Sequence, residues 1–158
     1  MRLFLLALFS FLILSPAYAQ TGSFDSLIRA GNSVECSYSK NDGSGGGTLF
    51  VADQKLRGEI QVNEHGQSYP MHMIHKDGLM YSWGGPMGEK QGMLMHVDPS
   101  RMANTGPGTA AQNMQEEMDF TCKPWSADVS QFEPPSDVEF MDMSQMMAGM
   151  MGQDAGNN

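Results

Sequence analysis

The sequence predicts a mainly β protein: a curved antiparallel sheet or half-barrel with one short N-terminal helix and a methionine-rich C-terminal tail. Three observations support this prediction. Six or seven short segments alternate between apolar and polar residues, and turns rich in Gly, Asn and Asp separate them. This alternation indicates strands with one buried face and one solvent-exposed face, which is typical of antiparallel rather than parallel sheets. The sequence also lacks the strand–helix–strand rhythm of a parallel α/β fold.

The first nineteen residues have the composition of a secretory signal peptide. Residues 1–2 are a short basic start, residues 3–14 are almost continuously apolar, and residues 17–19 (AYA) place small side chains where signal peptidase reads them. We therefore expect cleavage between Ala19 and Gln20 and a periplasmic or secreted mature protein. The apolar run is too short to cross a bilayer, and we expect no transmembrane segment elsewhere.

Removal of this segment leaves 139 of the 158 residues, enough for one domain with its own core. We expect a single antiparallel β-rich domain over residues 20–143 and a Met/Gly-rich tail, flexible or helical, over residues 144–158. The formal net charge of −9 becomes −10 once Arg2 is lost. Because nucleic-acid phosphates require clusters of Lys and Arg, this acidic balance argues against a nucleic-acid partner.

Cys36 and Cys122 are the only cysteines in the sequence. In an exported chain, two cysteines far apart in sequence predict one disulfide, whereas redox or metal-binding thiols usually have a close spacing such as CxxC. The predicted bond closes a loop of about 86 residues and, through chain entropy, would stabilise the fold by about 4 kcal/mol.

The elements follow in order from the N-terminus. Residues 23–30 predict a short helix, because Ser23 can cap its start, apolar residues recur at helical spacing, and Gly31 can take the left-handed closing position. Residues 33–39 alternate and predict a strand. Residues 40–47 (KNDGSGGG) predict a flexible loop.

Residues 48–52 and 55–62 predict the next two strands. The second has the clearest alternation in the sequence, with Leu56, Ile60 and Val62 on one face. Gly58 lies on that apolar face and indicates either a bulge or a bend in the sheet. Residues 63–67 predict the following turn.

Residues 69–97 predict three strands joined by Gly-rich turns, and they hold three of the four histidines and six methionines. A three-residue hairpin loop over residues 76–78 is expected, with Gly78 left-handed. The predicted pairs on one face are His75 with Leu79, Met73 with Tyr81, and Met71 with Trp83. Alternation places His72 and His75 on opposite faces.

The C-terminal part is less regular. Residues 99–115 are polar and weakly patterned and predict a long excursion. Residues 118–123 predict a strand that carries Cys122 back to Cys36. The proline-containing residues 124–135 predict extended coil, and residues 137–143 an edge strand.

Catalysis finds no support in the sequence, and we expect no enzyme. There is no GxSxG motif and no recognisable Ser–His–acid arrangement. The glycine run GSGGG lacks the Lys and Ser/Thr of a phosphate-binding loop.

Methionine is the compositional outlier, with sixteen residues. Thioether sulfur and imidazole are ligands suited to soft metal ions, so one hypothesis is a copper or silver site. The alternative is structural, because methionine is also a flexible filler of packed sheet faces. The metal hypothesis names Met71, His72, Met73, His75, Met93, Met95 and His96. The tail methionines resemble Met-rich segments of exported copper-handling proteins.

A second hypothesis concerns an apolar ligand. A sheet that curls without closing would present aromatic rings and mobile methionines along an adaptable groove. The candidate ligand-binding residues are Met71, Met73, Tyr81, Trp83, Met93 and Met95.

Four segments carry a resemblance over roughly residues 33–143: KLRGEIQV, HMIHKDGLMYSWGG, GMLMHV and FTCKPWSADVSQFEPPSDVEFMDM. They resemble small uncharacterised exported bacterial proteins, which in turn are similar to the outer-membrane lipoprotein-carrier (lipoprotein localisation) superfamily. The resemblance implies a curved antiparallel half-barrel with helices inside or across its mouth, sometimes binding an acyl chain. Three functions follow as hypotheses: a non-enzymatic carrier of an apolar or acyl ligand or partner segment, a copper or silver binder, or an envelope interaction protein without a small ligand.

Overall fold

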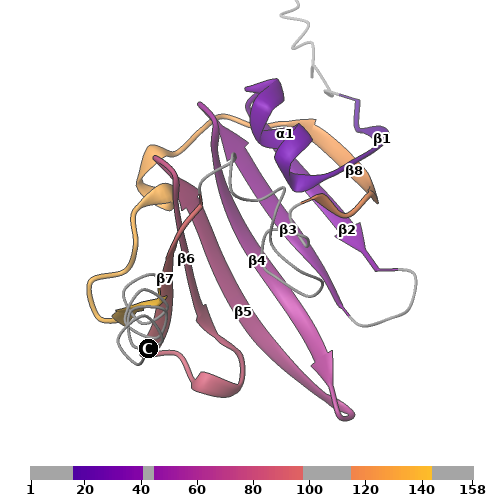
Figure 1. Cartoon of the computed structure of the whole chain (residues 1–158). Helices are drawn as coiled ribbons and strands as arrows, with labels where there is room; N and C mark the ends of the chain where they lie inside the picture. Colours follow the sequence, from indigo (N-terminus) through magenta and orange to yellow (C-terminus); the bar gives the residue numbers. More distant parts are fainter. Residues whose placement is uncertain (1–15, 41–44, 98–114, 144–158) are drawn as a thin grey trace, which may run out of the picture.

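The computed structural model describes residues 16–40, 45–97 and 115–143 of the chain. These residues form one nine-stranded sheet with the strand order β1-β8-β2-β3-β4-β5-β6-β7-β9 (Figure 1). The strands are β1 (Tyr18–Gly22), β2 (Val34–Ser39), β3 (Gly45–Ala52), β4 (Lys55–Glu64), β5 (Gln67–Lys76), β6 (Leu79–Gly84), β7 (Gln91–His96), β8 (Met118–Pro124) and β9 (Glu139–Asp142). Because β1 and β9 are edges that do not pair with each other, the sheet is open, and the mainly β prediction is confirmed.

Three tight hairpin turns connect β3 to β6. The turn residues are the pairs 53–54, 65–66 and 77–78, and all six have positive φ angles between 50° and 78°. Such turns match the right-handed twist of the strands they join. The turn predicted over residues 63–67 is therefore too long, since β4 continues to Glu64 and β5 begins at Gln67.

The predicted three-residue loop between β5 and β6 is wrong. Asp77 and Gly78 alone form the turn, so Lys76 pairs with Leu79 and the register differs by one residue from the predicted one. A shift of one residue moves every side chain of a strand to the other face. Met80 and Ser82 consequently lie on the same face as the odd-numbered residues of β5. Tyr81 and Trp83 lie on the opposite face.

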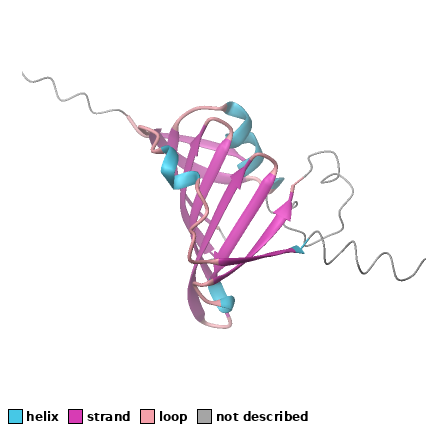
Figure 2. Cartoon of the chain, turned by 90° about the vertical axis from the view of Figure 1, so that its left-hand side faces the viewer, coloured by secondary structure: helices cyan, strands magenta, loops and turns pink. Residues whose placement is uncertain are grey.

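One helix covers part of one face of the sheet. The helix α1 (Phe24–Ala30) begins at the N-cap Ser23 and ends at Gly31, which is left-handed with φ 67°, as predicted. Its buried side chains join a core contributed by strands from β2 to β8. Figure 2 shows the strands curving around this side, which we call the concave face. No helix in the described ranges is long and apolar enough to span a membrane.

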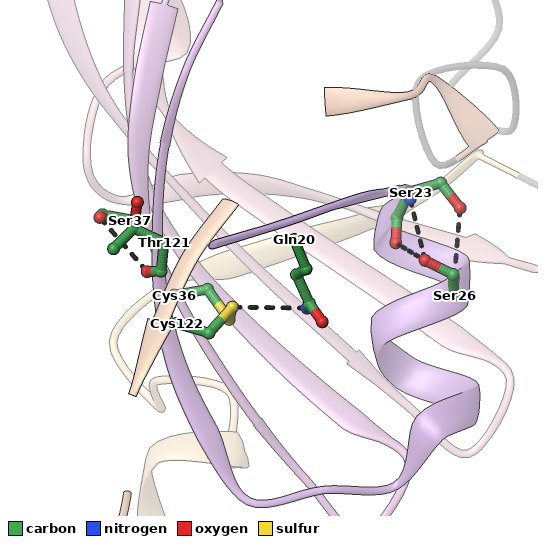
Figure 3. The surroundings of a disulfide bond; sticks show 7 residues. All are labelled: Gln20, Ser23, Ser26, Cys36, Ser37, Thr121 and Cys122. Atoms are coloured by element: carbon green, nitrogen blue, oxygen red, sulfur yellow. Dashed lines mark hydrogen bonds between the residues drawn. A yellow bond between two sulfur atoms is a disulfide. The ribbon is translucent and has the colours of Figure 1, made fainter. Parts of the chain in front are cut away.

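The disulfide between Cys36 and Cys122 joins directly paired residues of β2 and β8. Figure 3 shows Gln20 of β1 reaching the bond, where its side-chain amide donates to Sγ of Cys122 at 3.4 Å. The disulfide prediction is confirmed. The strand β1 was not predicted from the sequence, and it begins at Tyr18, before the predicted cleavage site.

Residues 125–138, which we call the covering segment, pack on the convex face. The segment contains the 3-10 helix η2 (Val129–Phe132), which was not predicted, and leads into β9. The edge position of β9 is as predicted, but its pairing with β7 is parallel. A second 3-10 helix, η1 (Gly85–Met87), follows β6. The predictions for most of the signal segment, for residues 98–114 and for the tail lie outside the described residues.

Candidate ligand-binding site

A pocket of about 490 Å3 lies on the concave face. Side chains from α1 and from β2, β4, β5, β6, β7 and β8 line it. Strands β2 and β7 are separated by four other strands in the sheet and reach the same pocket because the sheet curls around it. Its wall is mostly apolar, and the methionines in it are Met71, Met73, Met80, Met93, Met95 and Met118.

The sheet register arranges these methionines in rows across the strands. Met80 of β6 pairs directly with Met95 of β7, and Ser82 lies between Met73 and Met93 in the next row. Side chains directly opposite on antiparallel strands have Cβ atoms about 4.5–5.5 Å apart, so each row forms continuous contact surface. The unbranched thioether side chains can change rotamer to fit a ligand.

Glycines leave room on this face. Gly58 of β4 pairs with Met73 in an uninterrupted ladder, so it marks neither a bulge nor a break in pairing. A Cβ at this position would lie 2.7 Å from Cγ of Met73, which shows that the methionine packs over the glycine. Gly45 lines the pocket from β3, which begins three residues earlier than predicted because residues 45–47 pair with β4.

Few charged groups border the pocket. Among its described lining residues, Lys40 is the one cation and Glu116 the one carboxylate, and they form an ion pair with Nζ 2.9 Å from Oε2. Tyr38 also lines the pocket. Burial raises its pKa to about 12, and the charge of Glu116 acts in the same direction. The hydroxyl is therefore neutral at physiological pH and can donate a hydrogen bond.

The structure brings four of the six predicted ligand-binding residues together. Met71, Met73, Met93 and Met95 line the pocket, whereas Tyr81 and Trp83 face the convex side. The two rings instead pack edge-on against Phe140 of β9, with centroids 5.2 Å and 6.0 Å away. The predicted three-residue hairpin loop placed the two rings on the same face as Met71 and Met73, whereas the two-residue turn places them on the opposite face.

The predicted metal ligands are also divided between the faces. Met71, Met73, His75, Met93 and Met95 are on the concave side, as the register with the core residues of β4 and β6 shows. The other two predicted ligands, His72 and His96, are on the convex side. The opposite placement of His72 and His75 agrees with the prediction.

The two convex histidines have other neighbours. His72 stacks on Trp83 at 5.2 Å between ring centroids, and the guanidinium of Arg57 lies 5.4 Å from the same indole. Nε2 of His96 lies 3.9 Å from a carboxylate oxygen of Asp142. Within the described ranges, no group of three or more His, Cys, Asp or Glu side chains is arranged to hold a metal ion. A single centre built from the whole predicted set is therefore excluded by geometry.

His75 has an unusual environment on the concave face. Its Nδ1 is buried and has no hydrogen-bond partner among the described residues. Burial lowers the pKa of its imidazole below the ordinary value of 6.5, and the nearby charges of Asp25 and Asp77 oppose that change. The ring is therefore mainly neutral at neutral pH.

Sequence reasoning missed twelve of the sixteen described residues that line the pocket, among them Tyr38, Lys40, Met80, Glu116 and Met118. Two of them had a usable signal. The Asp-Gly pair at 77–78 favours a two-residue hairpin turn, which places Met80 beside His75. Met118 lies four residues before Cys122 on the same strand, so the two side chains point to the same face. Because the disulfide is on the core face, Met118 is expected there as well. No local signal indicates that Lys40 and Glu116 meet, because 76 residues separate them.

Comparisons of the chain with protein-family models, with curated proteins and with solved structures find no match.

Proposed function

We propose that the protein is an exported, non-enzymatic binding protein that holds an apolar or acyl ligand in the concave pocket. The main observation in support of this proposal is the methionine-lined pocket on the concave face. Its volume of about 490 Å3 is within the roughly 300–1,000 Å3 of pockets that bind small molecules. A mostly apolar wall with few polar groups favours a ligand that has a long apolar part and one polar end.

Two further features support parts of the proposal. The Cys36–Cys122 disulfide suits an oxidising compartment, in agreement with the signal-like residues 1–19. Cleavage between Ala19 and Gln20 would leave residues 20–22 of β1 paired with β8. The resemblance to the lipoprotein-carrier superfamily stays a prediction, and transfer of lipoproteins is not needed to explain the pocket.

The direct test is the binding of a fluorescent long-chain fatty acid to delipidated mature protein. Ser82 is small and lies on the pocket floor between two methionines, so Ser82→Phe should fill the hollow and abolish binding. Ser37 is exposed on the convex side of β2, and Ser37→Phe is the matched control that should bind normally. Failure of the unmodified protein to bind, or equal binding by both variants, would refute the proposal.

The ion pair at the pocket offers a second, finer test. Lys40 is held by Glu116, so Glu116→Gln should free the ammonium group for a carboxylate ligand. Both side chains are partly exposed, and pairs of this kind contribute about 0.2–1 kcal/mol. We expect affinity for a fatty acid to rise by up to about fivefold relative to the corresponding fatty alcohol. An equal change for acid and alcohol would show that the ammonium group does not contact the ligand's polar end.

A further inference from the structure

The two-residue turn at residues 77–78 places a histidine and two methionines side by side on the concave face. His75 of β5 pairs directly with Met80 of β6, and Met80 pairs directly with Met95 of β7. Residues opposite each other in this way have Cβ atoms about 4.5–5.5 Å apart. Because the three side chains extend from the inner side of a curved sheet, the curvature brings their ends closer together.

The imidazole in this row is suited to act as a ligand. Its Nδ1, like that of His72 on the convex face, is buried and makes no hydrogen bond to the described residues, and only the ring of His75 lies beside two methionines. A neutral imidazole has one nitrogen that accepts and one that donates, so one lone pair is available to a metal ion. The charged groups that act on the ring are Asp25 from α1 and Asp77 from the turn.

The two thioethers define the class of ion. Sulfur of methionine and imidazole nitrogen are soft or borderline donors and select ions such as Cu(I) over Mg²⁺ or Ca²⁺, which require oxygen. Met80 and Met95 both line the pocket, so an ion entering the pocket can reach them. Their side chains have three rotatable bonds and can converge on one point.

We propose that His75, Met80 and Met95 bind one soft monovalent cation, Cu(I) or Ag(I), on the concave face, where Met80 and Met95 line the pocket and His75 lies beside Met80. Met73 and Met93 are both diagonal to Met80 in the register and are the nearest further thioethers. The site differs from the set predicted from the sequence, because it gains Met80 and keeps only His75 and Met95 of the seven predicted ligands. It does not depend on the proposed apolar ligand.

The first test is a titration of the full mature protein with Cu(I) and, separately, with Ag(I). Copper is kept reduced with ascorbate, which leaves the disulfide intact, and a chromogenic Cu(I) chelator competes for the metal. Native mass spectrometry counts the ions bound. We expect at least one ion per chain under competition, and the absence of any bound ion would overturn the proposal.

Variants then locate the ion. Met80→Leu and Met95→Leu preserve volume and remove sulfur, and His75→Gln removes the imidazole. Loss of an outer-shell partner already costs roughly 10–100-fold in metal affinity, so each of these changes should weaken binding at least about tenfold. Met71→Leu, in a different row of the same pocket, is the matched control and should bind normally. An equal loss in the control, or none in the three variants, would refute the assignment.

Methyl NMR separates this site from the methionines of the tail. With Met methyl groups labelled, Ag(I) should shift the signals of Met80 and Met95 first, and His75→Gln should abolish those shifts. Shifts confined to the methionines of residues 144–158 would place the ion on the tail and overturn the proposal. Because fatty-acid binding is measured separately in the same variants, the two proposals can fail independently.

Discussion

The concave and convex faces of the sheet use alternate residues of the same strands, yet they are packed in different ways. On the concave face, flexible methionines and glycines surround a pocket of about 490 Å3. On the convex face, Phe50 of the sheet packs against Trp125 of the covering segment, and Trp125 packs edge to face with Phe132, which is 1% exposed. Rigid rings and the covering segment fill the convex side, whereas flexible, unbranched methionines surround an unfilled pocket on the concave side.

Polar contacts also hold the covering segment in place. Nη1 of Arg57 donates to the carbonyl of Gln131 at 3.4 Å, and Nζ of Lys76 lies 2.7 Å from a carboxylate oxygen of Glu133. Both cations extend from the convex side of the sheet. The convex face therefore has a packed core of its own, and the comparison predicts that its residues contribute more to stability than those around the pocket.

The largest expected effect is on the convex face. Phe132→Ala would leave a cavity under the covering segment and should reduce the free energy of unfolding by about 3–5 kcal/mol. Urea denaturation followed by tryptophan fluorescence measures the change. Val129, in the same 3-10 helix, is 64% exposed, so Val129→Ala should change stability by less than about 0.5 kcal/mol. Equal effects of the two changes would show that the segment does not cover a core.

The disulfide joins β2 to β8, whereas five of the six pocket methionines are on β5 to β7. Replacing Cys36 and Cys122 together by Ala should lower the free energy of unfolding by about 2–5 kcal/mol, because the bond constrains a loop with a sequence separation of 86 residues. Thermal unfolding of the two proteins measures this difference. If the pocket depends on β5 to β7 as the comparison implies, the folded variant should still bind the fluorescent fatty acid.

A matched pair of glycine substitutions compares the two faces directly. A Cβ at Gly92 would lie 2.7 Å from the ring of Phe140 and 2.8 Å from the carbonyl oxygen of Ser82, so Gly92→Ala should cost about 1–3 kcal/mol. A Cβ at Gly58 meets the flexible side chain of Met73 beside an open pocket. Gly58→Ala should therefore cost less than about 1 kcal/mol, as measured by urea denaturation. A larger cost at Gly58 would mean that the concave face is as rigid as the convex one.

A smaller effect depends on pH. Because the pKa of His75 is lower in the folded protein than its ordinary 6.5, the unfolded state takes up the proton first as the pH falls. The stabilising contribution is present above pH 6.5 and is lost as the pH falls through the folded-state pKa. Acidification from neutral pH should therefore destabilise the unmodified protein more than His75→Gln. Identical pH profiles of the free energy of unfolding would contradict a buried neutral imidazole.

The smallest effect is a spectroscopic one. With its pKa raised to about 12, Tyr38 should ionise after the other tyrosines in an absorbance titration of tyrosinate. The last ionisation should be missing in Tyr38→Phe. Stability contributed by the neutral hydroxyl is present below pH 10 and is lost as the pH rises towards the folded-state value. If Tyr38→Phe does not alter the last step, the hydroxyl is accessible to solvent.

Local patterns in the sequence predicted a large part of the fold. The helix at residues 23–30 was predictable because Ser23 and Gly31 act within one turn of its ends. The strand over residues 55–62 was predictable because its alternation is regular, and its ends differ by at most two residues. The disulfide followed from the number of cysteines and the predicted export of the chain.

The missed elements depend on partners distant in sequence. Residues 45–47 are glycines with no strand preference, and they are extended because β4 pairs with them. The strand β1 exists through its pairing with β8, about one hundred residues away. The parallel orientation of β9 depends on the path of the covering segment around the convex face.

The sequence by itself determined which residues alternate, where the chain turns and that its chemistry is dominated by methionine, because these properties act over a few residues. Tertiary structure decided which methionines meet. A one-residue difference in the turn at residues 77–78 moved Met80 to the side of His75 and moved Trp83 to the opposite face. Curvature then brought β2 and β7 to one pocket. Register and curvature arise from pairing across the whole sheet, so no local pattern contains them.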